Sequence, residues 1–261
     1  MNQAPWLSVI TVVKDDNAGL LTTLASLKSQ NLDGVEHVVV DSSAISEERT
    51  VAAFNLLSIN RIFSWIEPSG IYPAMNRGLE FANGTFVYFL NAGDTFLNES
   101  VLERVHRSLT ELHPQWAFGP VVIQEPHGAT TLTPPWNYQR EKVSGFSNGY
   151  FPAHQGTFAH RALLSSFGGF DVQYKVAADY AAFLRLSQVA DPLILDFPIA
   201  TFQEGGTSTT HWKLSFREFH YARKSILKLT GIHALKAEFN SLLHFVRVWL
   251  VRDVLHRIRA N

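Results

Sequence analysis

The stretch VYFLNAGDTF, Val87–Phe96, joins a short apolar run to a small polar turn. The apolar run has the composition of a buried strand, which we predict over Thr85–Leu90. This strand leads into Asn91–Asp94, where a single carboxylate stands at the tip. Asparagine, glycine and aspartate are ordinary turn residues, so the stretch by itself favours a plain turn over a metal and phosphate site.

The residues before this stretch repeat a pattern of strand followed by helix. Short apolar or β-branched runs predict strands over Leu7–Val13, Val35–Val40 and Ile62–Ile66. Helical patterns follow these strands and begin near Asn17, Glu47 and Pro73. Strands that are apolar on both faces and alternate with helices indicate an α/β fold, with a mostly parallel sheet flanked by helices.

Two acidic positions stand where such sheets bind ligands. Ligands lie beyond the carboxyl ends of parallel strands, and both Asp41 and Asn91–Asp94 follow predicted strands. A carboxylate there can hold Mg²⁺ together with the phosphates of a substrate. Asp41 can accept hydrogen bonds from a ribose or a base, or it can serve only as a turn or cap residue. Position in the sheet thus makes Asp94 a candidate site residue.

The second half of the chain carries further polar candidates. Arg77 can pair with phosphate, although a solvated helix face explains it as well. His154 and Gln155 are polar residues in an apolar setting. Asp179 opens a predicted helix and can act as a general base, or it can simply interact with the helix dipole.

The remaining segments are assigned more coarsely. Residues 113–150 are rich in proline, glycine and aromatic residues, and we predict irregular strands and loops there. The later elements that we predict are helices over Leu163–Phe167 and Asp179–Ser187, a strand over Leu193–Ile199, and helices from Trp212 onward.

Composition bounds the class of protein. The chain has 261 residues, 46% of them apolar, so a sizeable core can form. Cysteine is absent, which excludes disulfides and thiolate sites. We expect no signal peptide and no membrane-spanning helix. The formal net charge is −1, yet residues 213–261 hold ten Lys or Arg against three acids, which predicts a basic appendage that meets an anionic surface.

The ordered motifs resemble the family 2 glycosyltransferases of the GT-A fold, which are inverting enzymes that use nucleotide-sugars. The resemblance covers about residues 7–210. Within the family, the chain resembles the bacterial exopolysaccharide enzymes of the colanic-acid gene-cluster type. The motifs that carry it are LSVITVV, VVVDSS, GIYPAMNRG, FLNAGD, AHQGTF, GGFDVQYKVAADYAAFLRL and EGGTSTT.

The resemblance implies roles for individual residues. Asp179 would be the catalytic base, and Asp94 would ligate Mn²⁺ or Mg²⁺. His154 and Gln155 would lie near donor and acceptor. The donor would be a UDP- or GDP-sugar and the acceptor a saccharide or lipid-linked saccharide, with no role for nucleic acid. The residues implied in donor binding are Thr11, Asp41, Asn76, Arg77, Asn91, Asp94, Gly205 and Gly206.

Several positions depart from the family pattern. Pro73 replaces an acid, Ala181 stands where a second acid is common, and the metal motif has one carboxylate. These departures keep open an alternative, in which the chain is an inactive binding subunit of a polysaccharide assembly complex. A dinucleotide-binding dehydrogenase is disfavoured because no G-x-G-x-x-G follows the first strand.

The predicted organisation is a glycosyltransferase domain over residues 1–210 and a basic amphipathic extension over residues 211–261. Residues 1–100 would form the nucleotide-binding half of the domain, and residues 101–210 the acceptor half. In residues 240–261 apolar residues interleave with arginines, which predicts either peripheral contact with the inner face of the plasma membrane or packing on protein. The expected location is the cytoplasm.

Overall fold

A computed structural model describes residues 4–44, 60–125, 128–134, 136–147, 150–203 and 211–250. The helix predicted near Glu47 and the Gly205–Gly206 pair lie outside these residues. All statements on structure refer to the described part of the chain.

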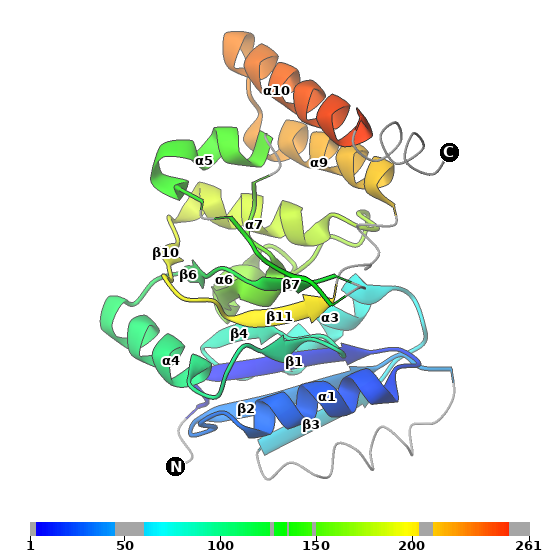
Figure 1. The fold of residues 1–261 in the computed structure, drawn as a ribbon, viewed down its shortest axis with the longest axis vertical. Coiled ribbons are helices and arrows are strands. Elements are labelled where there is room, and N and C mark those ends of the chain that lie inside the picture. Colours follow the sequence, from blue (N-terminus) through cyan, green and yellow to red (C-terminus); the bar gives the residue numbers. More distant parts are fainter. Residues whose placement is uncertain are drawn as a thin grey trace.

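A mixed, mostly parallel sheet forms the centre of the molecule (Figure 1). Its strand order is β10-β6-β9-β4-β1-β2-β3, and antiparallel pairing is confined to β9 with its two neighbours. The predicted α/β architecture is therefore confirmed. The strands are β1 (Leu7–Val13), β2 (Val35–Asp41), β3 (Asn60–Trp65), β4 (Phe86–Phe89), β6 (Trp116–Phe118), β9 (Thr157–His160) and β10 (Leu193–Ile194).

Both faces of the sheet are covered, as the apolar strands predict. Successive side chains of β1 alternate between two cores, so Val9 packs into one and Ile10 into the other. Helix α1 (Asn17–Lys28) contributes Leu20 to the core that contains Val9. Helix α3 (Ile71–Phe81) contributes Met75 to the core that contains Ile10.

One helix start agrees with the prediction and one differs. Helix α1 begins at Asn17, as predicted, and its cap is Asp16, whose carboxylate accepts a hydrogen bond from the Gly19 N–H at 2.8 Å. Helix α3 begins at Ile71, two residues before Pro73. The other helices that cover the sheet are α4 (Val101–Leu112), α6 (Arg161–Ser166) and α7 (Ala178–Val189).

The single strand predicted over Leu193–Ile199 is wrong, because this segment crosses between two sheets. Strand β10 ends at Ile194, and the chain then joins a smaller sheet through β11 (Ala200–Gln203). Pro198 lies at the crossing and has no N–H to donate to a ladder. The smaller sheet has the order β5-β11-β7-β8, with β5 (Thr95–Phe96), β7 (Val122–Gln124) and β8 (Thr130–Leu132).

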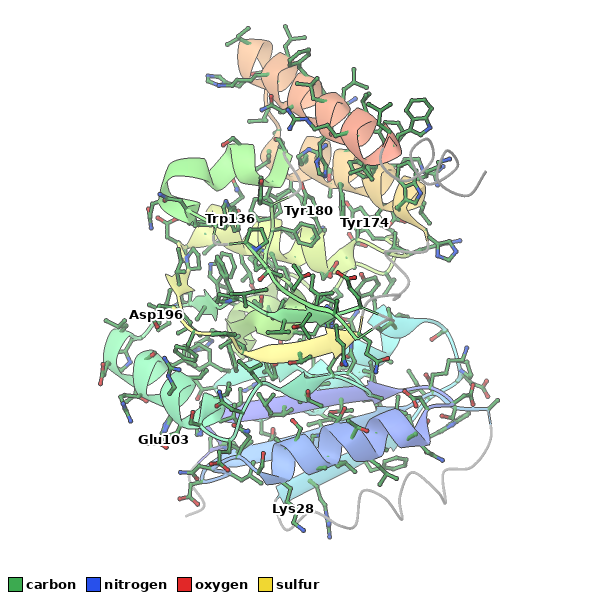
Figure 2. All side chains as sticks on the ribbon, viewed as in Figure 1. Lys28, Glu103, Trp136, Tyr174, Tyr180 and Asp196 are labelled. Carbon is green, nitrogen blue, oxygen red and sulfur yellow. The ribbon has the colours of Figure 1, made fainter. Side chains whose placement is uncertain are left out.

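Helices α5 (Tyr138–Ser147), α9 (Trp212–Leu227) and α10 (Gly231–Trp249) cover the far side of α7 (Figure 1). Helix α5 falls in a segment predicted to be irregular. Tyr180 is buried among rings of this layer, with its centroid 5.4 Å from that of Phe146 and 4.4 Å from that of Phe219 (Figure 2). Because α9 adds Ala222 to the main core, the extension and the body share one interior.

Within the described ranges, no helix combines the length and the hydropathy that crossing a bilayer requires.

Candidate active site

The turn after β4 presents Asn91 and Asp94 at the carboxyl edge of the sheet. The Asp94 N–H donates to the Asn91 carbonyl at 3.0 Å, which closes a four-residue turn. Gly93 has a φ of 91°, a conformation that L side chains rarely adopt, so glycine suits this position. The buried Thr23 hydroxyl of α1 lies 2.8 Å from the Asp94 carbonyl and accepts the Gly93 N–H at 3.0 Å. The Thr23 side chain of α1 thus fixes the conformation of the turn.

His154 and Gln155 reach the same edge from the opposite direction. They form a short 3₁₀ helix, η1 (His154–Gly156), immediately before β9. Strand β9 runs antiparallel to β4, so the start of β9 lies beside the end of β4. The Tyr88 hydroxyl of β4 donates to the Gln155 carbonyl at 2.6 Å, which ties η1 to the strand.

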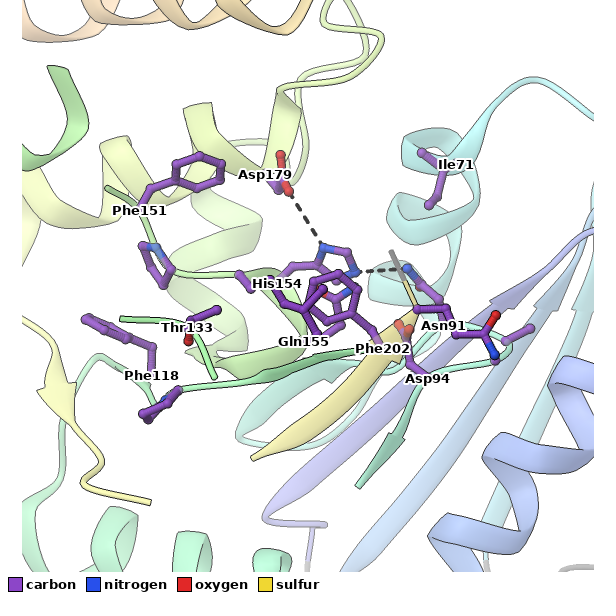
Figure 3. Close-up of a pocket in the computed structure, with 18 of the residues that line it drawn as sticks. Ile71, Asn91, Asp94, Phe118, Thr133, Phe151, His154, Gln155, Asp179 and Phe202 are labelled. Atoms are coloured by element: carbon purple, nitrogen blue, oxygen red, sulfur yellow. Dashed lines mark hydrogen bonds and ion pairs between the residues drawn. The ribbon is translucent and has the colours of Figure 1, made fainter. Parts of the chain in front are cut away.

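A line of polar contacts crosses the site from β4 to α7 (Figure 3). Asn91 Nδ2 lies 2.9 Å from His154 Nε2, and His154 Nδ1 lies 3.6 Å from Asp179 Oδ2. One tautomer of a neutral imidazole suits both neighbours, with its proton on Nδ1 and Nε2 accepting from the Asn91 amide. The 3.6 Å separation is longer than a hydrogen bond, so the two groups interact as a close charge–dipole pair.

Asp179 is the second residue of α7 and is held from a second side by Tyr72. The Tyr72 hydroxyl donates to Asp179 Oδ1 at 3.2 Å. Burial, and next the negative charge of Asp179, raise the pKa of Tyr72 well above its usual value. Tyr72 therefore stays protonated and donates to the carboxylate throughout the neutral range. The sequence motif contained Tyr72 but assigned it no role.

Asp94 is 8% exposed, and burial raises its pKa from 3.8 to about 6, against opposing effects of His154 and Gln155. Its Oδ2 and Asn91 Oδ1 have no hydrogen-bond partner among the described residues. Buried acceptors normally have a partner, so these two atoms suit a cation or a donor group of a ligand. No group of three His, Asp or Glu in the described residues could hold a metal. A metal at Asp94 therefore fits only with further ligands, such as substrate oxygens.

These side chains line a cavity of about 1140 Å³. The polar lining residues include Asn91, Asp94, His154, Gln155 and Asp179. The aromatic and apolar lining residues include Phe118, Pro120, Trp136, Phe151 and Phe202. Lys175 is the one Lys or Arg among the described lining residues, and no motif in the sequence analysis assigned it a role. The cavity thus combines carboxylates, one cation and an aromatic wall.

Four residues implied in donor binding do not line this cavity. Thr11 is fully buried, with its hydroxyl 2.9 Å from His37 Nε2. Asn76 exchanges hydrogen bonds with the backbone of Phe170, and Arg77 pairs with Glu80 at 2.7 Å on the helix surface.

Asp41, the fourth of these residues, is also fully buried. One carboxylate oxygen accepts the Ser43 N–H at 2.7 Å, and the other has no partner among the described residues. Asp41 therefore keeps an acceptor at the end of β2 that no described residue satisfies, while the side chains of Thr11, Asn76 and Arg77 already have partners within the protein.

Glu218 of α9 organises the start of α7 from outside the predicted domain. Its carboxylate accepts the backbone N–H groups of Lys175 at 3.0 Å, Val176 at 3.0 Å and Ala177 at 3.1 Å. The three residues directly precede α7, the helix that carries Asp179. Backbone N–H groups at the start of a helix have no partner within the helix, so an outside acceptor such as Glu218 satisfies them. Nothing in the local pattern around Glu218 signals this contact.

Comparison with known proteins identifies the class. Residues 8–166 match the family model for glycosyl transferase family 2, which spans more than half of the chain. The chain belongs to this family and is a glycosyltransferase of the GT-A fold.

Two mycobacterial relatives are similar over most of the chain. An uncharacterized glycosyltransferase of Mycobacterium tuberculosis is 28% identical over 80% of this chain and 79% of its own length. A PGL/p-HBAD biosynthesis glycosyltransferase of Mycobacterium bovis is 27% identical over 79% of this chain and 80% of its own length.

Two solved structures share the fold. TarS of Staphylococcus aureus has a TM-score of 0.68 at 18% identity, over 94% of this chain and 73% of TarS residues 1–349. TarS has also been solved with UDP-GlcNAc. The mannosyltransferase PcManGT of Pyrobaculum calidifontis, in complex with GDP-Man and Mn²⁺, has a TM-score of 0.62 at 14% identity, over 94% of this chain and 75% of its own.

The raised pKa of Asp94 predicts that Asp94→Asn stabilises the protein without metal. Because the pKa is higher in the folded chain, the folded state loses stability as the pH rises from about 4 to about 6. We expect the variant to gain about 1–3 kcal/mol in the free energy of unfolding at pH 8, and clearly less at pH 5. Urea unfolding in EDTA measures both. The exposed control Asp33→Asn should change neither value, and an equal gain at both pH values would contradict the prediction.

The three hydrogen bonds of Glu218 predict a large cost for its removal. Glu218→Ala leaves three N–H groups without their acceptor, so we expect a loss of about 2–4 kcal/mol in the free energy of unfolding. Glu218→Gln keeps one carbonyl oxygen and should lose less. Glu238→Ala removes an exposed contact to His220 on the same extension and should cost less than about 1 kcal/mol. Similar urea midpoints for Glu218→Ala and Glu238→Ala would exclude the bracing role.

Proposed function

We propose that the chain transfers a sugar from a nucleotide-diphospho-sugar to a hydroxyl group of a saccharide or lipid-linked saccharide, with inversion at the anomeric carbon. The observation that carries this proposal is the placement of Asp179 and Asp94 in one cavity, joined through His154 and Asn91. A single displacement requires a base for the acceptor hydroxyl and a separate group that stabilises the leaving diphosphate. Asp179 suits the first role, and Asp94 suits the second as a carboxylate that can hold a metal. The biological setting that we propose is bacterial surface polysaccharide biosynthesis, in the cytoplasm.

Asp179 is the proposed general base. It takes the proton of the acceptor hydroxyl while the acceptor oxygen forms a bond to the anomeric carbon. The bond from that carbon to the diphosphate breaks, and the diphosphate leaves with the electron pair. Tyr72 and His154 hold the two oxygens of Asp179, which orients the base before the acceptor arrives.

Asp94 is the proposed ligand of Mn²⁺ or Mg²⁺, with the remaining ligands from the donor diphosphate. When bound, the metal would neutralise charge on the leaving group. The free Oδ2 of Asp94 supports this role, and so does the Mn²⁺ in the complex of PcManGT. Lys175 is placed to add a positive charge to the same cavity.

The relatives support the proposed class of donor and acceptor. TarS and PcManGT have been solved with UDP-GlcNAc and GDP-Man, which supports a UDP- or GDP-sugar as donor. The name of the mycobacterial relatives in PGL/p-HBAD biosynthesis supports a saccharide or lipid-linked acceptor. Phe151 and Phe202 line the cavity and are only partly buried, so they offer apolar faces against which a sugar ring can pack.

Substitution of the base tests the reaction. Asp179→Asn should lower the rate of transfer by roughly 10²–10⁴-fold, because the amide cannot accept the proton. Affinity for the nucleotide-sugar should stay close to that of the unaltered protein, as measured by calorimetry. Asp33→Asn makes the same chemical change on an exposed loop and should leave both values unchanged. Near-normal turnover by Asp179→Asn would remove Asp179 as the base.

Thermal shifts with UDP-, GDP- and dTDP-sugars test donor and metal together. A ligand that binds only the folded state raises the melting temperature, so one nucleotide class should give a shift that grows with Mn²⁺. We expect Asp94→Asn to lose the Mn²⁺-dependent part of the shift, measured against its own ligand-free melting temperature. Asp179→Asn should keep it. A Mn²⁺-dependent shift that persists in Asp94→Asn would assign the metal to other residues.

A further inference from the structure

Helix α10 exposes a row of large apolar side chains. Each of them is between 39% and 71% exposed, although α10 lies against α9 (Figures 1 and 2). We call this set the α10 stripe, and it consists of Ile232, Leu235, Phe239, Leu242, Leu243, Val246, Trp249 and Leu250.

The α10 stripe occupies one face of the helix. Its members lie three or four residues apart, except for the adjacent pairs Leu242–Leu243 and Trp249–Leu250, and this spacing places them in one band along the axis. The opposite face holds α10 on α9. Ser241 is buried there and bonds to Arg223, and the Phe245 ring lies 5.6 Å from Trp212 and 5.4 Å from Phe216. The stripe therefore points away from the body, and contact with the body does not explain it.

A contiguous exposed apolar band of this size marks an interaction surface. Charge indicates the kind of partner. Lys236 and Arg247 are exposed on α10, and residues 213–261 hold ten Lys or Arg against three acids. A second copy of the chain would bring another basic segment against this one, and like charges repel. An anionic lipid surface offers apolar depth and negative charge together.

We propose that the α10 stripe docks on an anionic membrane surface, with α10 lying in the plane of the interface and its cations at the headgroups. The docked helix is joined to the candidate active site. Arg223 bonds to Ser241 of α10 and, at 3.1 Å, to the hydroxyl of Tyr180, the neighbour of Asp179. Docking would thus hold the cavity at a fixed place relative to the lipid surface. This inference does not depend on the proposed catalytic roles.

Co-sedimentation of the full chain with vesicles tests the proposal. The protein should pellet with vesicles of phosphatidylglycerol and phosphatidylcholine at least tenfold more than with phosphatidylcholine alone, and less so at high salt. The double variant Leu235→Ser, Phe239→Ser should lose this binding. The matched control is Leu112→Ser, Val189→Ser, whose leucine and valine are 62% and 58% exposed on other helices. The control should bind like the unaltered protein.

Three results would overturn the proposal. The first is no binding of the unaltered protein to anionic vesicles. The second is equal binding by the stripe variant and the unaltered protein. The third is a dimer in light scattering that the stripe variant dissociates, with no vesicle binding, which would assign the stripe to a second copy. Circular dichroism of each variant shows that it is folded, and none of these readings requires turnover, so the outcome for Asp179→Asn leaves them unaffected.

Discussion

The antiparallel register between β4 and β9 is the constraint on which the candidate site depends. Tyr88 pairs with Phe158, and the two rings stack with centroids 4.4 Å apart. This register sets the end of β4 beside the start of β9, so the Asn91–Asp94 turn meets His154 and Gln155. A slip of one residue would send alternate side chains to the opposite face and separate these groups. The parallel strands provide the edge, and one antiparallel strand completes it.

The site retains features that work against stability. Burial raises the pKa of Asp94, and one of its oxygens lacks a partner among the described residues. A residue selected for stability at that position would be neutral or fully paired. Glu218 is the opposite case, because three N–H groups surround its carboxylate. The fold thus stabilises the frame around the start of α7 and leaves one oxygen of Asp94 without a partner among the described residues, and such unfavourable features cluster at functional sites.

Local pattern was sufficient for the layer architecture and for the place of Asp94 at the edge of the sheet. The apolar runs predicted β1, β2 and β4, and Asp94 follows β4, because that information lies within a few neighbouring residues. Arg77 pairs with Glu80 on the helix surface, and a motif cannot distinguish a helix residue that faces a ligand from one that faces solvent. Pro198 lies at the crossing between the two sheets. The crossing could not be predicted, because the strands that pair with β10 and β11 are distant in sequence. Glu218 could not be predicted, because its three partners lie about forty residues earlier.

The bond pattern of Glu218 also has a consequence for synthesis of the chain. Chains emerge from the ribosome amino end first, and domains fold as their residues become available. The parallel strands and α7 are made before α9, so the N–H groups at the start of α7 have no acceptor from Glu218 until α9 has emerged. A growing chain can therefore assemble its sheet while the segment that carries Asp179 is still unbraced. The bracing of the candidate site is therefore completed last, after the scaffold of the sheet has folded.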